Sequence, residues 1–120
     1  MAKILIVDDL PTEVHLMREA ISKLGHTTLV AVDGEQALEM TKRENPDLVL
    51  LDVVLPRMDG FQVCRKIKKD PQTAKIPVIL VSSKTQESDK VWGLKQGASA
   101  YICKPFDPAE LVDTVTKNLH

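Results

Sequence analysis

The chain has 120 residues, with 16 lysines and arginines against 17 aspartates and glutamates and a formal net charge of -1. This length suits one domain, 43% hydrophobic residues are enough for a core, and the charge balance offers no basic field for nucleic acid or an anionic membrane. No apolar run approaches the roughly 20 residues that a membrane-spanning helix needs. We therefore expect a single domain over residues 1–120, with no output domain, no nucleic-acid binding and no membrane insertion.

The N-terminus and the two cysteines indicate a cytoplasmic protein. Met1, Ala2 and Lys3 run straight into a strand-like segment, so no signal peptide is expected. Cys64 and Cys103 stand in apolar surroundings without a CxxC spacing. We interpret them as small buried side chains in a reducing compartment.

Five strand-like runs alternate with five helix-like segments along the chain. The strand-like runs cover residues 3–7, 27–32, 48–51, 78–81 and 99–103. Proline, glycine and capping residues mark the expected starts and ends of the helices. We expect helices to begin near Pro11, Asp33, Asp59, Gln86 and Asp107, and the first four to end near Gly25, Pro46, Asp70 and Gly97. Asp33 and Gln36 have the spacing of a capping box, and the fifth helix should reach the C-terminus.

This alternation predicts parallel strands joined by right-handed helical crossovers, in a three-layer α/β domain. The runs 4–7, 48–51 and 78–81 are wholly apolar, which is typical of central strands buried on both faces. The two mixed runs, 27–32 and 99–103, should be the edges. The predicted fold is a flavodoxin-like, doubly wound, five-stranded parallel sheet in the order 2-1-3-4-5.

Polar side chains follow four of these strands where each one ends. They are Asp8 and Asp9, Asp52, Ser82 and Lys104. Each alone has a simple explanation as a helix cap, a loop residue or a surface charge. Ligands of such sheets bind outside the carboxyl ends of the strands, however, and all of these groups should meet at that rim.

Three neighbouring carboxylates repel one another and would raise each other's pKa, which a divalent cation resolves. Oxygen ligands with few protein donors favour Mg²⁺. A metal, the Lys104 ammonium, the Ser82 hydroxyl and a carboxylate nucleophile together suit phosphoryl transfer. Asp52 follows the central strand and is the best candidate for the nucleophile, which would form an acyl phosphate.

Over essentially its whole length the sequence resembles a bacterial response-regulator receiver domain. The matching residues are Asp8-Asp9, Asp52, Leu55-Pro56-Arg57-Met58-Asp59-Gly60, Ser82 and Tyr101-Ile102-Cys103-Lys104-Pro105. The resemblance implies that Asp52 accepts phosphate from a histidine kinase and that Lys104 binds a phosphoryl oxygen. It also implies that Lys104-Pro105 is a cis peptide and that the domain passes on its signal by binding other proteins.

The resemblance further implies the Mg²⁺ ligands and a switch. Asp9, Asp52 and the backbone carbonyl of Val54 would bind the ion, and Asp8 would reach it partly through water. Ser82 would move to hydrogen-bond the phosphoryl group, and Tyr101 would turn inward in response.

Two positions differ from many relatives. Ser82 replaces the more frequent threonine and keeps the hydroxyl, so its implied role is unchanged. Val54 is apolar where many relatives carry an amide or an acid, and Lys84 follows Ser82 by two residues. Neither side chain readily accepts a hydrogen bond from an attacking water, which predicts slow self-dephosphorylation.

Residues 76–98 are similar to stand-alone receivers of type IV pilus systems, which govern twitching motility and phototaxis. That resemblance implies a downstream protein target such as the pilus motor or its regulators. By family analogy the output face is formed by the fourth helix, fifth strand and fifth helix, with Trp92, Lys95, Tyr101 and Val112 as candidate contacts. Trp92 has the alternative interpretation of a partly buried packing residue.

Three other functions fit the sequence less well. An aspartyl-phosphate phosphatase would need a second acid two residues after Asp52, where Val54 stands. A flavin or nucleotide carrier would need a polar phosphate loop after the first strand, where Asp8 and Asp9 would repel phosphate. A phosphate-independent interaction module usually lacks one of the acidic or lysine positions, all of which this chain keeps.

Overall fold

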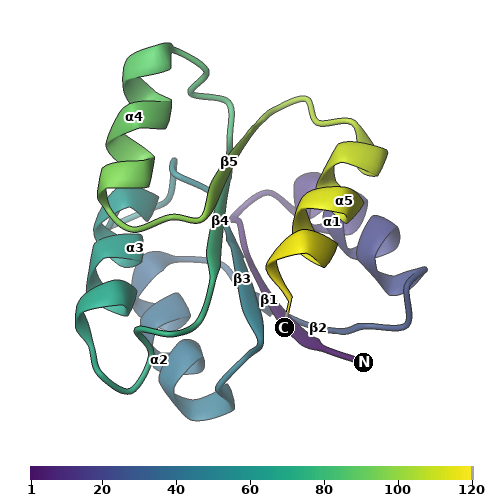
Figure 1. The fold of residues 1–120 in the computed structure, drawn as a ribbon, viewed down its shortest axis with the longest axis horizontal. Coiled ribbons are helices and arrows are strands. Elements are labelled where there is room, and N and C mark those ends of the chain that lie inside the picture. The colour runs from purple at the N-terminus through teal and green to yellow at the C-terminus, as the bar shows by residue number, and fades with distance from the viewer. Residues whose placement is uncertain (120) are drawn as a thin grey trace.

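The computed structural model describes residues 1–119, which form one five-stranded sheet with helices on both faces (Figure 1). In chain order the elements are β1 (Lys3–Val7), α1 (Pro11–Ser22), β2 (Thr27–Ala31), α2 (Gly34–Glu44), β3 (Leu48–Leu51), α3 (Gly60–Lys69), β4 (Val78–Ser82), α4 (Glu87–Lys95), β5 (Ala100–Cys103) and α5 (Pro108–Asn118).

The strand order is β2-β1-β3-β4-β5, and every neighbouring pair is parallel. The predicted flavodoxin-like fold is therefore confirmed. The wholly apolar β1, β3 and β4 lie in the centre, and the mixed β2 and β5 form the two edges. A central strand of a parallel sheet has helices over both faces, so nearly every side chain along it must be apolar.

The sheet divides the core into two apolar layers. Successive side chains of a strand point to opposite faces, so Leu5 and Val7 join one layer while Ile4 and Ile6 join the other. The first layer lies under α2, α3 and α4, and the second lies under α1 and α5, as the two groups of helices in Figure 1 show. This packing holds the carboxyl ends of the strands in a fixed arrangement.

The acidic residues expected to cap helices do so. The carboxylates of Asp33, Asp59 and Asp107 accept hydrogen bonds from the amides of Gln36 (2.8 Å), Gln62 (2.9 Å) and Ala109 (2.9 Å). The reciprocal half of the capping box at Asp33 differs from the prediction, because the Gln36 side chain accepts from the amide of Val32. Gln86 caps α4 and is not its first helical residue.

Several element ends differ from the predicted ones by one to a few residues. Helix α1 ends at Ser22, because its last turn tightens: the amides of Leu24 and Gly25 donate to the carbonyls of Ile21 and Ser22. Strand β2 ends at Ala31 because the Val32 amide turns to the Gln36 side chain. Strand β5 begins one residue later than predicted, at Ala100, and β4 extends by one residue to Ser82.

The last helix is shorter than predicted, and only one of the two cysteines is buried as predicted. Helix α5 ends at Asn118, and residue 120 lies outside the described part. Cys64 is buried as expected, whereas Cys103 on the edge strand is only half-buried, and both are free thiols. Among the described residues, no helix combines the length and the apolar character that crossing a membrane requires.

Candidate functional site

The register of the central strands places Asp8 and Asp52 side by side. Val7 pairs with Leu51, so the residue that follows each lies at the same rim. The Asp52 amide continues the ladder by donating to the Val7 carbonyl at 2.9 Å. The Asp8 side chain is fully buried and Asp52 is 5% exposed, so both carboxylates have little contact with water.

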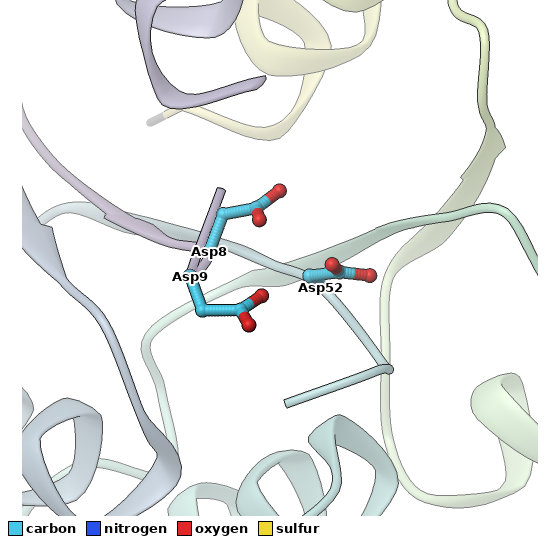
Figure 2. A group of neighbouring side chains, drawn as sticks. All are labelled: Asp8, Asp9 and Asp52. Atoms are coloured by element: carbon cyan, nitrogen blue, oxygen red, sulfur yellow. The ribbon is translucent and has the colours of Figure 1, made fainter. Parts of the chain in front are cut away.

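Asp9 completes a group of three carboxylates. Asp8, Asp9 and Asp52 each place one oxygen within 4.8 Å of the others (Figure 2). The picture shows the Asp8 and Asp9 side chains extending from the end of β1 toward the side on which Asp52 lies. Asp9 is exposed, in contrast to its two partners, so the group has one side open to solvent.

Lys104 enters this group from β5. Its amide donates to the Ser82 carbonyl at 2.8 Å, which extends the pairing of β4 with β5 beyond Cys103. Its Nζ lies 2.7 Å from Asp8 Oδ2 and 3.3 Å from Asp52 Oδ2, and the side chain is 9% exposed. Lys104 therefore neutralises part of the buried negative charge. The Lys104-Pro105 peptide is cis, as the resemblance predicts.

Burial and neighbouring charges shift the ionisation of Asp52 and Lys104. Burial raises the pKa of the Asp52 carboxyl, and the charge of Lys104 offsets only part of that increase. Burial by itself would lower the pKa of Lys104, but the hydrogen bond to Asp8 and the charges of Asp52, Asp8 and Glu13 together raise it. The lysine therefore remains a cation, and the Asp52 carboxylate is less stable in its ionised form than it would be in water.

A hollow of about 500 Å³ opens over the carboxylates. It is lined by Asp9, Leu10, Glu13, Asp52, Val54, Ser83, Lys104 and Pro105. This space gives a small ligand access to Asp52 and to the Lys104 ammonium. The Val54 side chain is half exposed beside it, and the Val54 amide donates to Asp52 Oδ1 at 3.3 Å.

The carboxylate group fits a hard divalent cation. Its donors are all oxygens, they converge from the ends of β1 and β3, and one side faces the hollow. Mg²⁺ prefers such a site because it keeps several waters and takes few protein ligands. Lys104 already contacts Asp8, and Asp8 Oδ1 accepts from the Leu10 amide at 3.0 Å. Asp9 and Asp52 line the hollow and Asp8 does not, so these two carboxylates are better placed for direct coordination than the fully buried Asp8.

Ser82 and Tyr101 meet the loop that follows β4 in different ways. Ser82 is fully buried, and its Oγ accepts from the Lys84 amide at 3.2 Å. The Tyr101 hydroxyl donates to the Lys84 carbonyl at 2.6 Å. Burial raises the pKa of that hydroxyl. Both side chains thus hydrogen-bond the backbone of the same loop residue, Lys84.

The expected output residues lie around the β5 edge. Trp92 and Lys95 on α4 are exposed, and 48% of Trp92 is accessible to solvent. Tyr101 and Val112 are half-buried, and Val112 packs against the layer under α1 and α5. Trp92 is therefore partly buried, as its interpretation as a packing residue predicts, and the other half of its surface is open to solvent.

Two residues of the site were missed in the sequence. Ser83 lines the hollow in place of the buried Ser82. Glu13 places Oε1 3.4 Å from Lys104 Nζ. An acid in the first turn of a helix is usually explained by its favourable interaction with the helix dipole. The one signal in the sequence that Glu13 could reach the same rim was its position four residues after Asp9.

The fold, the carboxylate group and the lysine define a class of protein. Comparison with known protein families matches residues 4–116 to the response regulator receiver domain. The match covers nearly the whole chain, so this protein belongs to that family, as the resemblance predicted.

Two individual relatives within this family are similar to the chain to different extents. It is 47% identical over 115 residues to the protein PilH of Pseudomonas aeruginosa, across 96% of this chain and 95% of PilH. It is 44% identical over 110 residues to the response regulator PleD of Caulobacter vibrioides, of which it spans 24%.

Solved structures agree with this assignment. The BeF₃-activated N-terminal receiver domain of RstA from Klebsiella pneumoniae superposes with a TM-score of 0.90 at 35% identity, covering 98% of each chain. The chemotaxis response regulator CheY4 of Vibrio cholerae superposes with a TM-score of 0.92 at 28% identity, covering 99% of each chain.

Proposed function

We propose that this protein is a cytoplasmic single-domain response regulator that accepts a phosphoryl group from a histidine kinase on Asp52 and signals by binding other proteins. The observation that carries the proposal is the placement of the Asp52 carboxylate at the end of the central strand, close to Asp9 and to the Lys104 ammonium. The hollow above it has room for a phosphoryl group.

The reaction is a displacement at phosphorus. An Asp52 oxygen forms a bond to phosphorus while the bond from phosphorus to the histidine nitrogen breaks, and the electron pair leaves with the imidazole. Lys104, which contacts Asp52 at 3.3 Å, is placed to bind a phosphoryl oxygen. Asp9, Asp52 and the Val54 carbonyl would hold Mg²⁺, with Asp8 reaching it partly through water, and the ion would supply further charge neutralisation. The transfer is catalysed by the receiver itself, and the protein acts on no separate substrate.

The residues around Lys84 are the proposed conformational switch. Ser82 and Tyr101 both hydrogen-bond the Lys84 backbone. When the Ser82 side chain moves to donate its hydroxyl to a phosphoryl group, its Oγ leaves the Lys84 amide, which removes one of these bonds and favours the inward position of Tyr101. The change then reaches Trp92, Lys95 and Val112 as a shift between two states of that surface.

The relatives support a role in pilus-based movement. PilH matches this chain nearly end to end at 47% identity, and residues 76–98 resemble receivers of type IV pilus systems. The proposed partners are therefore a histidine kinase and a downstream protein such as the pilus motor or one of its regulators.

Slow loss of the phosphoryl group is part of the proposal. The Val54 side chain is apolar and borders the hollow, and Lys84 carries a cation. Neither accepts a hydrogen bond from an attacking water. We expect the phosphorylated protein to persist for minutes or longer, and a lifetime of seconds in purified protein would contradict this.

Intact-protein mass spectrometry after incubation with Mg²⁺ and acetyl phosphate tests the proposal. The parent should gain one phosphoryl group, and Asp52→Asn should gain none. Sampling after removal of the donor gives the lifetime. A folded parent that gains no phosphate from acetyl phosphate or from a histidine kinase would instead favour the phosphate-independent interaction module.

A further inference from the structure

Lys104 has a third carboxylate partner that the phosphoryl-transfer chemistry does not need. Glu13 Oε1 lies 3.4 Å from Lys104 Nζ, and the Glu13 side chain is 25% exposed. Glu13 also lines the hollow over Asp52, whereas the next acid on the same helix, Glu19, does not. Because Glu13 and Asp52 contact the same ammonium nitrogen, their oxygens lie within about 7 Å of each other.

This arrangement gives the hollow more negative charge than cation binding requires. Asp8, Asp9 and Asp52 form the carboxylate group, and Glu13 adds a fourth negative charge beside the single ammonium of Lys104. A phosphoryl group entering the hollow brings negative charge of its own and competes with Glu13 for Lys104. Glu13 therefore opposes the entry of any free anion into the space where Asp52 must react.

We propose that Glu13 is a specificity-determining residue that disfavours small, free, doubly charged phosphodonors relative to a phosphohistidine presented by a protein. This inference rests on the proposed function. Docking of a protein donor offsets the repulsion with contacts elsewhere, whereas a small molecule has no such contacts. In the reaction with acetyl phosphate, an Asp52 oxygen bonds to phosphorus, the bond from phosphorus to the acyl oxygen breaks, and acetate leaves with the electron pair.

The test compares initial rates of phosphorylation of Asp52 in Glu13→Gln and in the parent, measured by intact mass at saturating Mg²⁺. Glutamine keeps the length of the side chain and removes the charge. With acetyl phosphate we expect Glu13→Gln to react about three- to tenfold faster, the effect of one charge at this separation in a partly hydrated site. Glu13→Asp keeps the charge and should stay close to the parent.

The matched control is Glu19→Gln. It removes the same charge from the same helix, and Glu19 is exposed and paired with His15 away from the hollow. Its rate should equal that of the parent. A gain of the same size in Glu19→Gln would overturn the proposal, because the effect would then come from net charge and not from the position of Glu13.

Donor charge and ionic strength separate repulsion from a structural effect. Phosphoramidate carries one net negative charge near neutral pH, so Glu13→Gln should accelerate it less than acetyl phosphate. The gain with acetyl phosphate should also shrink in added salt, which screens the repulsion. A gain that is equal for both donors and insensitive to salt would overturn the proposal.

The outcomes also distinguish this inference from the proposed function. Equal rates for the parent, Glu13→Gln and Glu19→Gln would overturn the role of Glu13 and leave phosphorylation of Asp52 intact. Phosphorylation of Glu13→Gln alone would support both. Absence of phosphorylation in all three folded proteins, with small donors and with a histidine kinase, would overturn both.

Discussion

Asp52 occupies a position in which its reactivity and the stability of the fold are opposed. Its carboxylate is 5% exposed, lies near two others, and has one full counter-charge at 3.3 Å, which it shares with Asp8 and Glu13. Burial raises its pKa despite the ammonium of Lys104. The folded protein therefore binds the Asp52 proton more tightly than the unfolded chain does, and ionising this group costs stability.

Replacing Asp52 with asparagine should stabilise the protein at neutral pH in the absence of divalent cations. We expect Asp52→Asn to raise the free energy of unfolding by about 1 kcal/mol at pH 7, the scale of a buried polar substitution. The gain is complete above the raised pKa of Asp52 and disappears as the pH falls below 3.8, the ordinary carboxyl value, where the group is protonated in both states. Urea unfolding at a series of pH values measures it.

An exposed carboxylate provides the comparison. Asp113 on α5 is paired with Lys117 in solvent, so Asp113→Asn should change stability little at any pH. An Asp52→Asn variant less stable than the parent at pH 7 would mean that the attraction to Lys104 exceeds the cost of burial.

The start of α3 fixes the loop that carries Asp52. The Gly60 amide donates to the Val53 carbonyl at 2.8 Å, and a Cβ at Gly60 would overlap the Asp52 carbonyl oxygen and lie 2.7 Å from the Val53 Cα. These neighbours are backbone atoms and cannot rotate aside. Glycine at this position is therefore a requirement of close packing between the helix and the end of β3.

Gly60→Ala should be strongly destabilising. We expect a loss of about 3 kcal/mol in the free energy of unfolding, because the helix must move away from β3 or the loop must distort. The variant should also accept phosphate on Asp52 more slowly. Urea unfolding and intact mass measure the two effects.

Gly25→Ala is a control that measures the cost of an unfavourable backbone conformation without the cost of steric overlap. Gly25 has φ +83°, and a Cβ there would meet no atom within 4 Å. Its loss should be about 1 kcal/mol, the cost of a left-handed conformation alone. Equal losses at the two glycines would show that the contact of Gly60 with Asp52 and Val53 carries no extra cost.

The helix starts were easier to predict than the ends because their causes are local. Asp33, Asp59 and Asp107 bond amides two or three residues away, so the residue types alone indicated them. The end of α1 depends instead on two tightened turns, although its apolar spacing continues to Leu24. No residue before Gly25 marks that change.

At the scale of the whole molecule, the strand ends could be predicted and the contacts across the rim could not. Alternating elements and apolar runs placed Asp8, Asp9, Asp52 and Lys104 at the carboxyl ends of parallel strands, and the register then brings them together. The approach of Glu13 to Lys104 joins the first turn of α1 to the residue after β5, and such a contact between distant parts of the chain depends on how the elements pack. At the end of β4, likewise, Ser82 is fully buried and Ser83 lines the hollow, which the residue types alone do not distinguish.

Because the carboxylate group exists only in the folded chain, Mg²⁺ should stabilise the whole molecule. The three residues come from the ends of β1 and β3, so unfolding separates Asp52 from Asp8 and Asp9. A ligand that binds only the folded state adds about 2.7 kcal/mol at one hundred times its dissociation constant. Asp9→Asn should lose most of this gain, yet be at least as stable as the parent without Mg²⁺, since one repulsive charge is gone. Thermal unfolding with and without Mg²⁺ measures both effects, and Asp113→Asn should keep the full response. An undiminished response in Asp9→Asn would place the cation away from the rim of the sheet.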